Sequence, residues 1–263
     1  EQLLSLIQLL EGAKIISLDT ETTSTNAIEA QLVGLSFAIE EHKAYYVPVP
    51  EDNNEAQKIV EKFRPIYENA DTVKVGQNIK YDLEVLRNYD VYLQGPLFDT
   101  MVAHYLLQPE QYHNMDFMAE VYLNYNTVHI DELIGPKGKT QKSMRQLAPS
   151  EVYAYACEDA DITLQLKNVL EPKLKEVRVD QLFHEVEMPL IPVLAEMECN
   201  GVRIDTAALK ETSEVFTQRM LQLEQDIYQA AGKTFNVSSP KQVGDILFGE
   251  MKIVDKPKKT KTG

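Results

Sequence analysis

A short apolar run that ends in two carboxylates constrains the fold of this chain more than any other stretch. Residues 14–23 read K-I-I-S-L-D-T-E-T-T. The apolar residues predict a buried strand, and because side chains alternate along a strand, Asp19 and Glu21 share one side of it. Two acids at the end of a core strand form a candidate cation site, although for this triplet alone a solvated strand end is an equally good interpretation.

The composition is that of an ordinary soluble globular chain. With 263 residues, 44% of them hydrophobic and 25% charged, it is long enough for one large domain or for one domain and part of a second. No apolar run reaches the roughly 18 residues of a membrane span, so we expect no membrane partner. Neither the first residues nor residues 258–263 resemble a natural terminus, so we expect a piece of a longer protein.

The two cysteines indicate a reducing environment. Cys157 and Cys199 lie far apart in sequence, without the C-x-x-C spacing of a zinc or redox site. We therefore expect a cytoplasmic protein.

The net charge of −15 argues against a protein that binds nucleic acid mainly through a broad basic surface. Clustered acids can instead hold divalent cations, which invert the local sign of the charge and leave DNA possible as a partner. An acidic surface kept for solubility is the alternative, and composition does not separate the two.

The pattern of the chain predicts a mixed sheet flanked by helices. Strands at 31–38 and 43–49 should form an antiparallel meander with the first strand. The same reasoning predicts, in order, a helix over 55–68, a strand at 72–76, an edge strand at 91–93, a helix over 101–107 capped by Asp99 or Thr100, loops and short helices over 108–148, and a helix over 149–173. Beyond these, Gly201 and Gly232 should end two further helices, and Ser239, Pro240 and Gln242 predict a capping box.

Two more stretches carry acids in positions suited to chemistry. Residues 76–82 read G-Q-N-I-K-Y-D, which places Asp82 in a first helical turn, where the macrodipole also favours an ordinary acid. In the long helix Tyr155 and Asp159 are four residues apart and share one face, whereas Glu158 and Asp161 point elsewhere. A half-buried aromatic beside a surface acid is the alternative interpretation of this pair.

A basic segment lies just before the long helix. It contains Lys137, Lys139, Lys142 and Arg145, which are the best local candidates for contact with phosphate. A solvated loop is the alternative.

Together these stretches resemble the DEDD superfamily of 3′–5′ exonucleases, in its tyrosine-bearing branch. The segments L-D-T-E-T, V-G-Q-N-I-K-Y-D, F-D-T-M and Y-A-C-E-D-A-D-I-T-L-Q-L look like the proofreading domain of bacterial family A DNA polymerases. Residues 187–190, 200–205 and 235–242 resemble the entry into the polymerase domain of the same family. The resemblance covers nearly the whole chain.

This resemblance implies an RNase H-like α/β fold, a mixed sheet flanked by helices, for residues 1–183. Residues 184–263 would be the truncated start of a polymerase domain, with helices of its thumb. The implied activity is proofreading hydrolysis of 3′-terminal nucleotides from DNA, within a parent DNA-directed DNA polymerase of replication and repair whose polymerase carboxylates lie outside this chain.

The resemblance also assigns roles to single residues. Two divalent cations are implied, Mg²⁺ with Mn²⁺ as a substitute, and carboxylate oxygens suit such hard ions. Asp19 would bridge both cations, Glu21 and Asp159 would complete the first site, and Asp82 would hold the second through water. Tyr155 would orient the attacking water rather than act as a base, since its ordinary pKa is near 10.

On the substrate side the resemblance places Gln77 and Asn78 at the terminal nucleotide of a single-stranded 3′ end bound by a monomer. Two positions depart from the family pattern: Thr25 stands where a Leu is common, and Ile130 stands where an aromatic residue is expected. Both positions help to seat the terminal base, so these departures put the grip on the substrate in doubt rather than the metal chemistry.

Two alternatives remain beside the proofreading exonuclease. One is an RNase D-like or helicase-associated exonuclease, which the stretches N-G-V-R-I-D and S-S-P-K-Q disfavour. The other is a catalytically silent exonuclease-fold scaffold, which the presence of all four acids and Tyr155 disfavours.

Overall fold

The computed structural model describes residues 1–254. The chain divides into two compact units, Glu1–Gly201 and Val202–Gly263, whereas the boundary expected from the sequence follows residue 183. Residues 258–263, which we expected to lead into a longer protein, lie outside the described residues. Among the helices of the described part, none is both long and apolar enough to cross a membrane.

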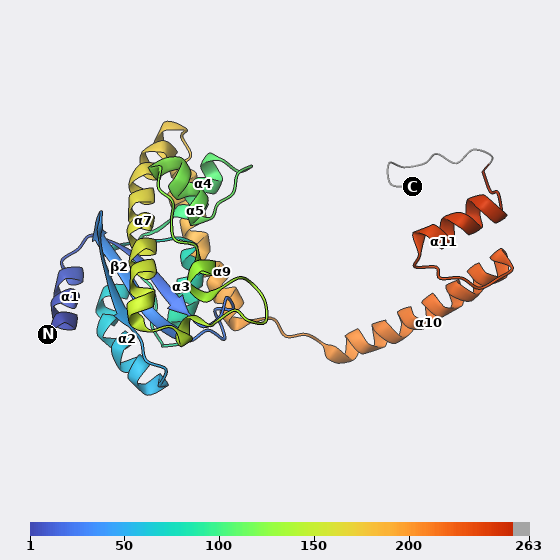
Figure 1. The fold of residues 1–263 in the computed structure, drawn as a ribbon, viewed down its shortest axis with the longest axis horizontal. Coiled ribbons are helices and arrows are strands. Elements are labelled where there is room, and N and C mark those ends of the chain that lie inside the picture. Colours follow the sequence, from blue (N-terminus) through green and yellow to red (C-terminus); the bar gives the residue numbers. More distant parts are fainter. Residues whose placement is uncertain (255–263) are drawn as a thin grey trace. The chain divides into compact units, whose positions relative to one another are not determined.

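The first unit is built on a five-stranded sheet (Figure 1). Its strands are β1 (Ile15–Thr22), β2 (Leu32–Glu40), β3 (Lys43–Pro48), β4 (Val73–Gly76) and β5 (Leu97–Asp99). The helices of this unit are α1 (Gln2–Glu11), α2 (Asn53–Tyr67), α3 (Ile79–Arg87), α4 (Thr100–Leu107), α5 (Met115–Met118), α6 (Ile130–Ile134), α7 (Pro149–Glu176), α8 (Asp180–Leu182) and α9 (Met188–Asn200). Short helical segments at Ala119–Leu123, Met144–Gln146 and Phe183–Glu187 complete it.

The sheet is mixed, as the sequence predicts. Its order is β3-β2-β1-β4-β5, with an antiparallel meander of β1, β2 and β3 and parallel pairing of β1 with β4 and of β4 with β5. The predicted edge strand at residues 91–93 is wrong, because the edge is formed by β5. The amide of Val91 donates to the Leu86 carbonyl and that of Tyr92 to the Glu68 carboxylate, so these residues close the turn after α3.

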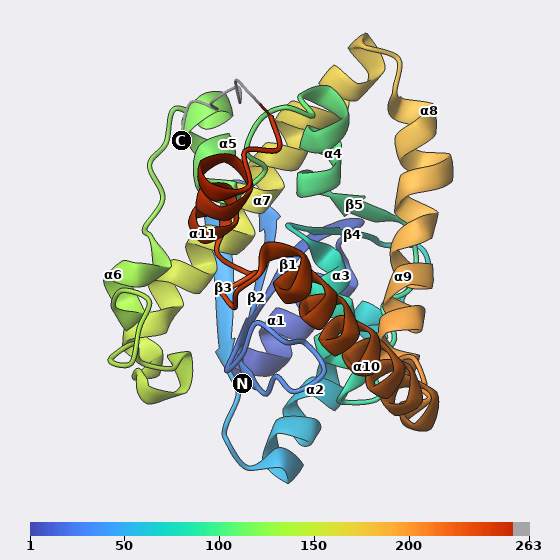
Figure 2. The same cartoon turned by 90° about the vertical axis from the view of Figure 1, so that its right-hand side faces the viewer.

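Helices cover both faces of the sheet. The ring of Phe37 in β2 stacks on Phe63 of α2, with ring centroids 5.1 Å apart. The next residue, Ala38, packs against Ala160 and Leu164 of α7. Because neighbouring strand residues point to opposite faces, α2 and α7 lie on opposite sides of the sheet, and α7 runs across its strands (Figure 2).

The strand register decides where the first two acids point. Opposite residues of an antiparallel pair share a face, and Ser17 pairs with Ala38, which faces α7. Asp19 and Glu21 follow at intervals of two and therefore also face α7. Thr20 lies on the other face, as Leu18 does.

The second unit is helical in the part that the structure describes. It contains α10 (Thr206–Ala231), α11 (Pro240–Gly244) and the short segment Asp245–Glu250. Gly232 ends α10 in the left-handed conformation, with φ +71°. Only half of the predicted capping box forms: the Ser239 hydroxyl accepts from the Gln242 amide, but the Gln242 side chain accepts from the Asn236 amide instead of Ser239.

Asp99 joins the beginnings of two helices. Its buried carboxylate accepts hydrogen bonds from the amides of Met101 and Val102 at the start of α4 and of Ile79 at the start of α3, at 2.8, 3.1 and 2.8 Å. It therefore caps α4, as the sequence predicts, and also fixes the helix that carries Asp82.

We predict that Asp99→Ala lowers the free energy of unfolding by about 2–4 kcal/mol, because it leaves the starts of two helices without their acceptor inside the protein. Asp52→Ala is the matched control, since the exposed Asp52 caps only α2 through Asn54 and Glu55. That variant should lose about 1 kcal/mol. Urea unfolding measures both, and equal losses would contradict the double role of Asp99.

Lys74 of β4 gives the fold a pH dependence. Its ammonium is buried and donates to the carbonyls of Asn69 and Gln94, and burial lowers the pKa of Lys74 from 10.5 to about 8. Between these values the unfolded chain binds more protons than the folded one, so this group makes the folded state more stable as pH rises. Lys74→Met should remove that rise in urea unfolding series across this range, whereas Lys62→Met, at an exposed position, should keep it.

Candidate active site

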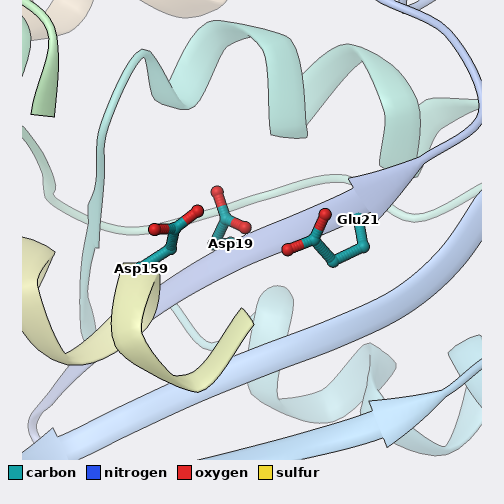
Figure 3. A group of neighbouring side chains, drawn as sticks. All are labelled: Asp19, Glu21 and Asp159. Carbon is teal, nitrogen blue, oxygen red and sulfur yellow. The ribbon is translucent and has the colours of Figure 1, made fainter. Parts of the chain in front are cut away.

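Three acids from two elements converge on one point of the first unit. Asp19 and Glu21 come from β1 and Asp159 from α7, and one oxygen of each lies within 4.8 Å of the others. Figure 3 shows the carboxylates of Asp19 and Asp159 side by side, with that of Glu21 next to them on the strand. The structure thus brings together three of the four acids that the sequence singles out as metal ligands.

The orientation of α7 separates Asp159 from its acidic neighbours. Glu158 accepts from the Tyr125 hydroxyl and from the amide of Val128, at 2.7 and 2.8 Å. Asp161 accepts from the amide of His42 in the turn between β2 and β3, at 2.6 Å. Both acids therefore serve the fold, and Asp159 alone of the three faces β1, as the helix spacing predicts.

Asp82, from α3, contacts β1 through Thr20. Its Oδ1 accepts from the amide and the hydroxyl of Thr20, at 3.0 and 2.7 Å. Strand β4 ends at Gly76, so this part of the β1 edge has no neighbouring strand and Asp82 takes its place. The carboxylate lies next to the three-acid group without being part of it.

Burial, and for three of the acids the charge of Asp19, disfavours the ionised form. Burial raises the pKa of Asp19 to about 6, although the Thr20 backbone amide opposes the change. Burial also raises the pKa of Glu21, Asp82 and Asp159 well above the ordinary value, and the charge of Asp19 adds to the rise in each of them. A positive charge among these groups would reverse the effect.

The donor set fits a divalent cation. Glu21 Oε1 is buried and has no hydrogen-bond partner within the described chain. Among the described residues, no Lys, Arg or His forms an ion pair with any of the four acids. Carboxylate oxygens are the ligands that hard divalent cations prefer, so Asp19, Glu21 and Asp159 form a candidate metal centre.

Tyr155 stands one helical turn before Asp159. Its ring packs in a small apolar cluster with Val33, Met144 and Val152. Burial, and then the neighbouring charge of Asp159, raises the pKa of the Tyr155 hydroxyl above its ordinary value. The hydroxyl therefore remains protonated and can donate a hydrogen bond beside the acids.

The three-acid group opens into a cleft of about 460 Å³. Three of the predicted substrate contacts line it, namely Thr25, Asn78 and Ile130. Asn78 adopts the left-handed conformation, with φ +60°, before α3, and its side chain makes no capping hydrogen bond to that helix.

Gln77 lies differently from its predicted neighbour. Its side-chain amide donates to the carbonyl of His113 at 2.8 Å and accepts from the Thr100 hydroxyl. Both ends of the amide are therefore used inside the protein, and Gln77 is absent from the residues that line the cleft.

Several residues of the cleft are not among the site residues that the sequence indicated. Tyr81 lines the cleft, and its hydroxyl bonds to Thr22 and to the Ser24 carbonyl, which holds the loop after β1. The cleft is also lined by Gln141, Lys142, Ser143 and Met144, of which the sequence indicated only Lys142, as part of the basic segment. Their loop has no periodic pattern, so its place at the cleft has no signal in the sequence.

Comparisons with known proteins agree with this geometry. A family model described as 3′–5′ exonuclease matches residues 1–175, and one described as DNA polymerase family A matches residues 206–263. The DNA polymerase I of Pseudomonas aeruginosa is 39% identical over 256 residues, which cover 93% of this chain and 28% of that protein. That of Borreliella burgdorferi is 36% identical over 262 residues, which cover 98% of this chain and 28% of that protein. The chain thus spans little more than a quarter of these relatives.

Solved structures show the same fold. The POL domain of Pol1 from M. smegmatis, in complex with DNA primer-template and dNTP, has a TM-score of 0.80 and 22% identity and covers 100% of this chain and 42% of that one. Brucella melitensis NrnC bound to pGG has a TM-score of 0.60 and 17% identity, over 74% of this chain and 91% of that one. The fold is RNase H-like α/β, as the sequence resemblance implied. The chain belongs to the 3′–5′ exonuclease family and carries, after that domain, the beginning of a family A DNA polymerase region.

Proposed function

We propose that this chain is the proofreading part of a DNA polymerase I and removes 3′-terminal nucleotides from DNA, as a monomer acting on a single-stranded end. The observation that carries the proposal is the convergence of Asp19, Glu21 and Asp159 within 4.8 Å without a cationic partner among the described residues. In a catalytically silent scaffold, nothing would offset the free-energy cost of keeping these three acids together. The division at residue 183 and the cytoplasmic setting stay predictions.

The acids have separate roles in this proposal. Asp19, Glu21 and Asp159 would hold one divalent cation, and Asp82 together with Asp19 would hold a second. Two bound Mg²⁺ ions would supply the positive charge that activates a water and stabilises the leaving 3′ oxygen. The buried Glu21 Oε1 supports this assignment, because this acceptor atom has no hydrogen-bond partner among the described residues.

The remaining residues bind and orient. The protonated hydroxyl of Tyr155 donates to the attacking water and fixes its direction, a positioning role. Asn78 contacts the terminal nucleotide, with Thr25 and Ile130 at its base. The direct test is the timed degradation of a labelled single-stranded oligonucleotide with Mg²⁺ and with EDTA, and degradation that continues in EDTA would refute a metal mechanism.

We predict that Asp19→Asn and Asp159→Asn abolish tight Mn²⁺ binding and lower the rate of degradation by about 1000-fold or more, because each removes a ligand charge worth several kcal/mol in the transition state. Titration calorimetry and single-turnover kinetics measure the two effects. Asp161→Asn is the matched control on the same helix, since Asp161 binds His42 instead of facing the acids. If it were as inactive as Asp159→Asn, the assignment would fail.

We also predict that Thr25→Leu combined with Ile130→Phe lowers KM for a short oligonucleotide several-fold. Both side chains line the cleft, and Ile130 is 42% exposed, so a larger group has room. Stacking a base on an aromatic ring is worth about 1–3 kcal/mol, roughly 5- to 150-fold in affinity. Because the metal ligands are unchanged, kcat should change little.

The aromatic residues Phe117 and Tyr125 do not line this cleft, and the Tyr125 hydroxyl is bound by Glu158. Their positions therefore favour Thr25 and Ile130 as the sites where a larger side chain would add a stack. An unchanged KM in a folded double variant would show that the terminal base is seated elsewhere.

A further inference from the structure

The four basic residues of the segment 137–145 have different uses. The guanidinium of Arg145 donates to the carbonyl of Val49 at 2.5 Å and to that of Leu32, so it ties the segment to the ends of two strands. Lys142 lines the cleft beside the three-acid group, whereas Lys137 and Lys139 are not among the lining residues. One of the four is therefore structural and one faces the site.

Lys142 stands on an anchored piece of backbone. Its amide donates to the carbonyl of Ile134 at 2.8 Å. The next residue, Ser143, caps the short helix Met144–Gln146, and the Met144 side chain is buried. The backbone that carries Lys142 is thus held against the first unit by Arg145 and by these contacts.

Among the described residues, Lys142 has no acidic partner. Within the part of the chain that the structure describes, its ammonium forms no ion pair, although the protein has a net charge of −15. It is the one basic side chain that lines the cleft there, and Asp19, Glu21 and Asp159 line the same cleft. Divalent cations would neutralise the phosphate being hydrolysed, but the phosphates farther along a bound strand would still meet an acidic protein.

We infer that Lys142 binds a phosphodiester group of the DNA strand next to the 3′-terminal nucleotide, with Gln141 and Ser143 as neutral hydrogen-bonding neighbours. The inference rests on the proposed exonuclease activity and adds the group that holds the strand behind its reacting end. Lys142 contributes binding and positioning and takes no part in the chemical step.

The test compares Lys142→Gln with Lys139→Gln, a control that removes the same charge from the same loop away from the cleft. We expect Lys142→Gln to raise KM for a single-stranded oligonucleotide about 3- to 10-fold, with kcat within about twofold. The slope of log(kcat/KM) against log salt concentration should become shallower by about 0.7, the value for one lost phosphate contact on a single strand. Lys142→Arg should restore both, and Lys139→Gln should change neither.

Three results would overturn the inference. An unchanged KM and salt slope in Lys142→Gln would show that no phosphate contact exists, and equal effects of Lys139→Gln would indicate a diffuse field of charge instead of a contact. A fall in kcat at constant KM would place Lys142 in the chemistry. Mn²⁺ binding of each variant should equal that of the unchanged protein, whose own Mg²⁺-dependent degradation tests the proposed function separately.

Discussion

Four carboxylates, one half-buried and three buried, lie together without a counter-charge among the described residues, and this is the constraint on which the rest of the structure depends. Burial raises the pKa of Asp19, Glu21, Asp82 and Asp159, and the charge of Asp19 adds to the rise in the other three. Taking even one such charge out of water costs several kcal/mol unless it is compensated. The surrounding packing must therefore hold the acids together until a cation binds, and cation binding should in turn stabilise the folded chain.

Small residues between the sheet and α7 permit this close approach. Ala38 of β2 packs directly on Ala160 of α7, next to Asp159 in sequence. Gly34 lies opposite Glu21 in the strand register, and a Cβ on Gly34 would stand 2.2 Å from the ring of Tyr46. The Tyr46 ring fills the space over Gly34. Burial, and then the charge of Glu21, raises the pKa of its hydroxyl. The packing around the acids of β1 thus depends on the absence of a side chain at Gly34 as well as on the Tyr46 ring that lies there.

The sequence predicted those features that periodicity encodes. Alternation along β1 and the spacing of Tyr155 and Asp159 gave the faces of the acids, because both elements have regular geometry. The strand prediction for residues 91–93 is wrong because a β-rich composition does not determine which backbone groups pair with another strand. Here the Tyr92 amide donates to the Glu68 side chain instead. For the same reason the sequence did not distinguish Gln77, bound inside the protein, from Asn78. The sequence also led to the same prediction for Arg145 and Lys142. Only the tertiary structure shows that the Arg145 guanidinium binds a backbone carbonyl.

The groups proposed to hold metal and those proposed to bind the substrate stand on different kinds of element. The acids stand on a core strand and on helices, where packing and hydrogen bonds such as Thr20 to Asp82 restrict their motion. The expected DNA contacts, Thr25, Ile130 and Lys142, stand in loops or at a helix start around the cleft. Loops tolerate substitution better than the core does. In the proposed function, the departures that the resemblance indicates at Thr25 and Ile130 would therefore alter the grip on a DNA end while leaving the carboxylates in place.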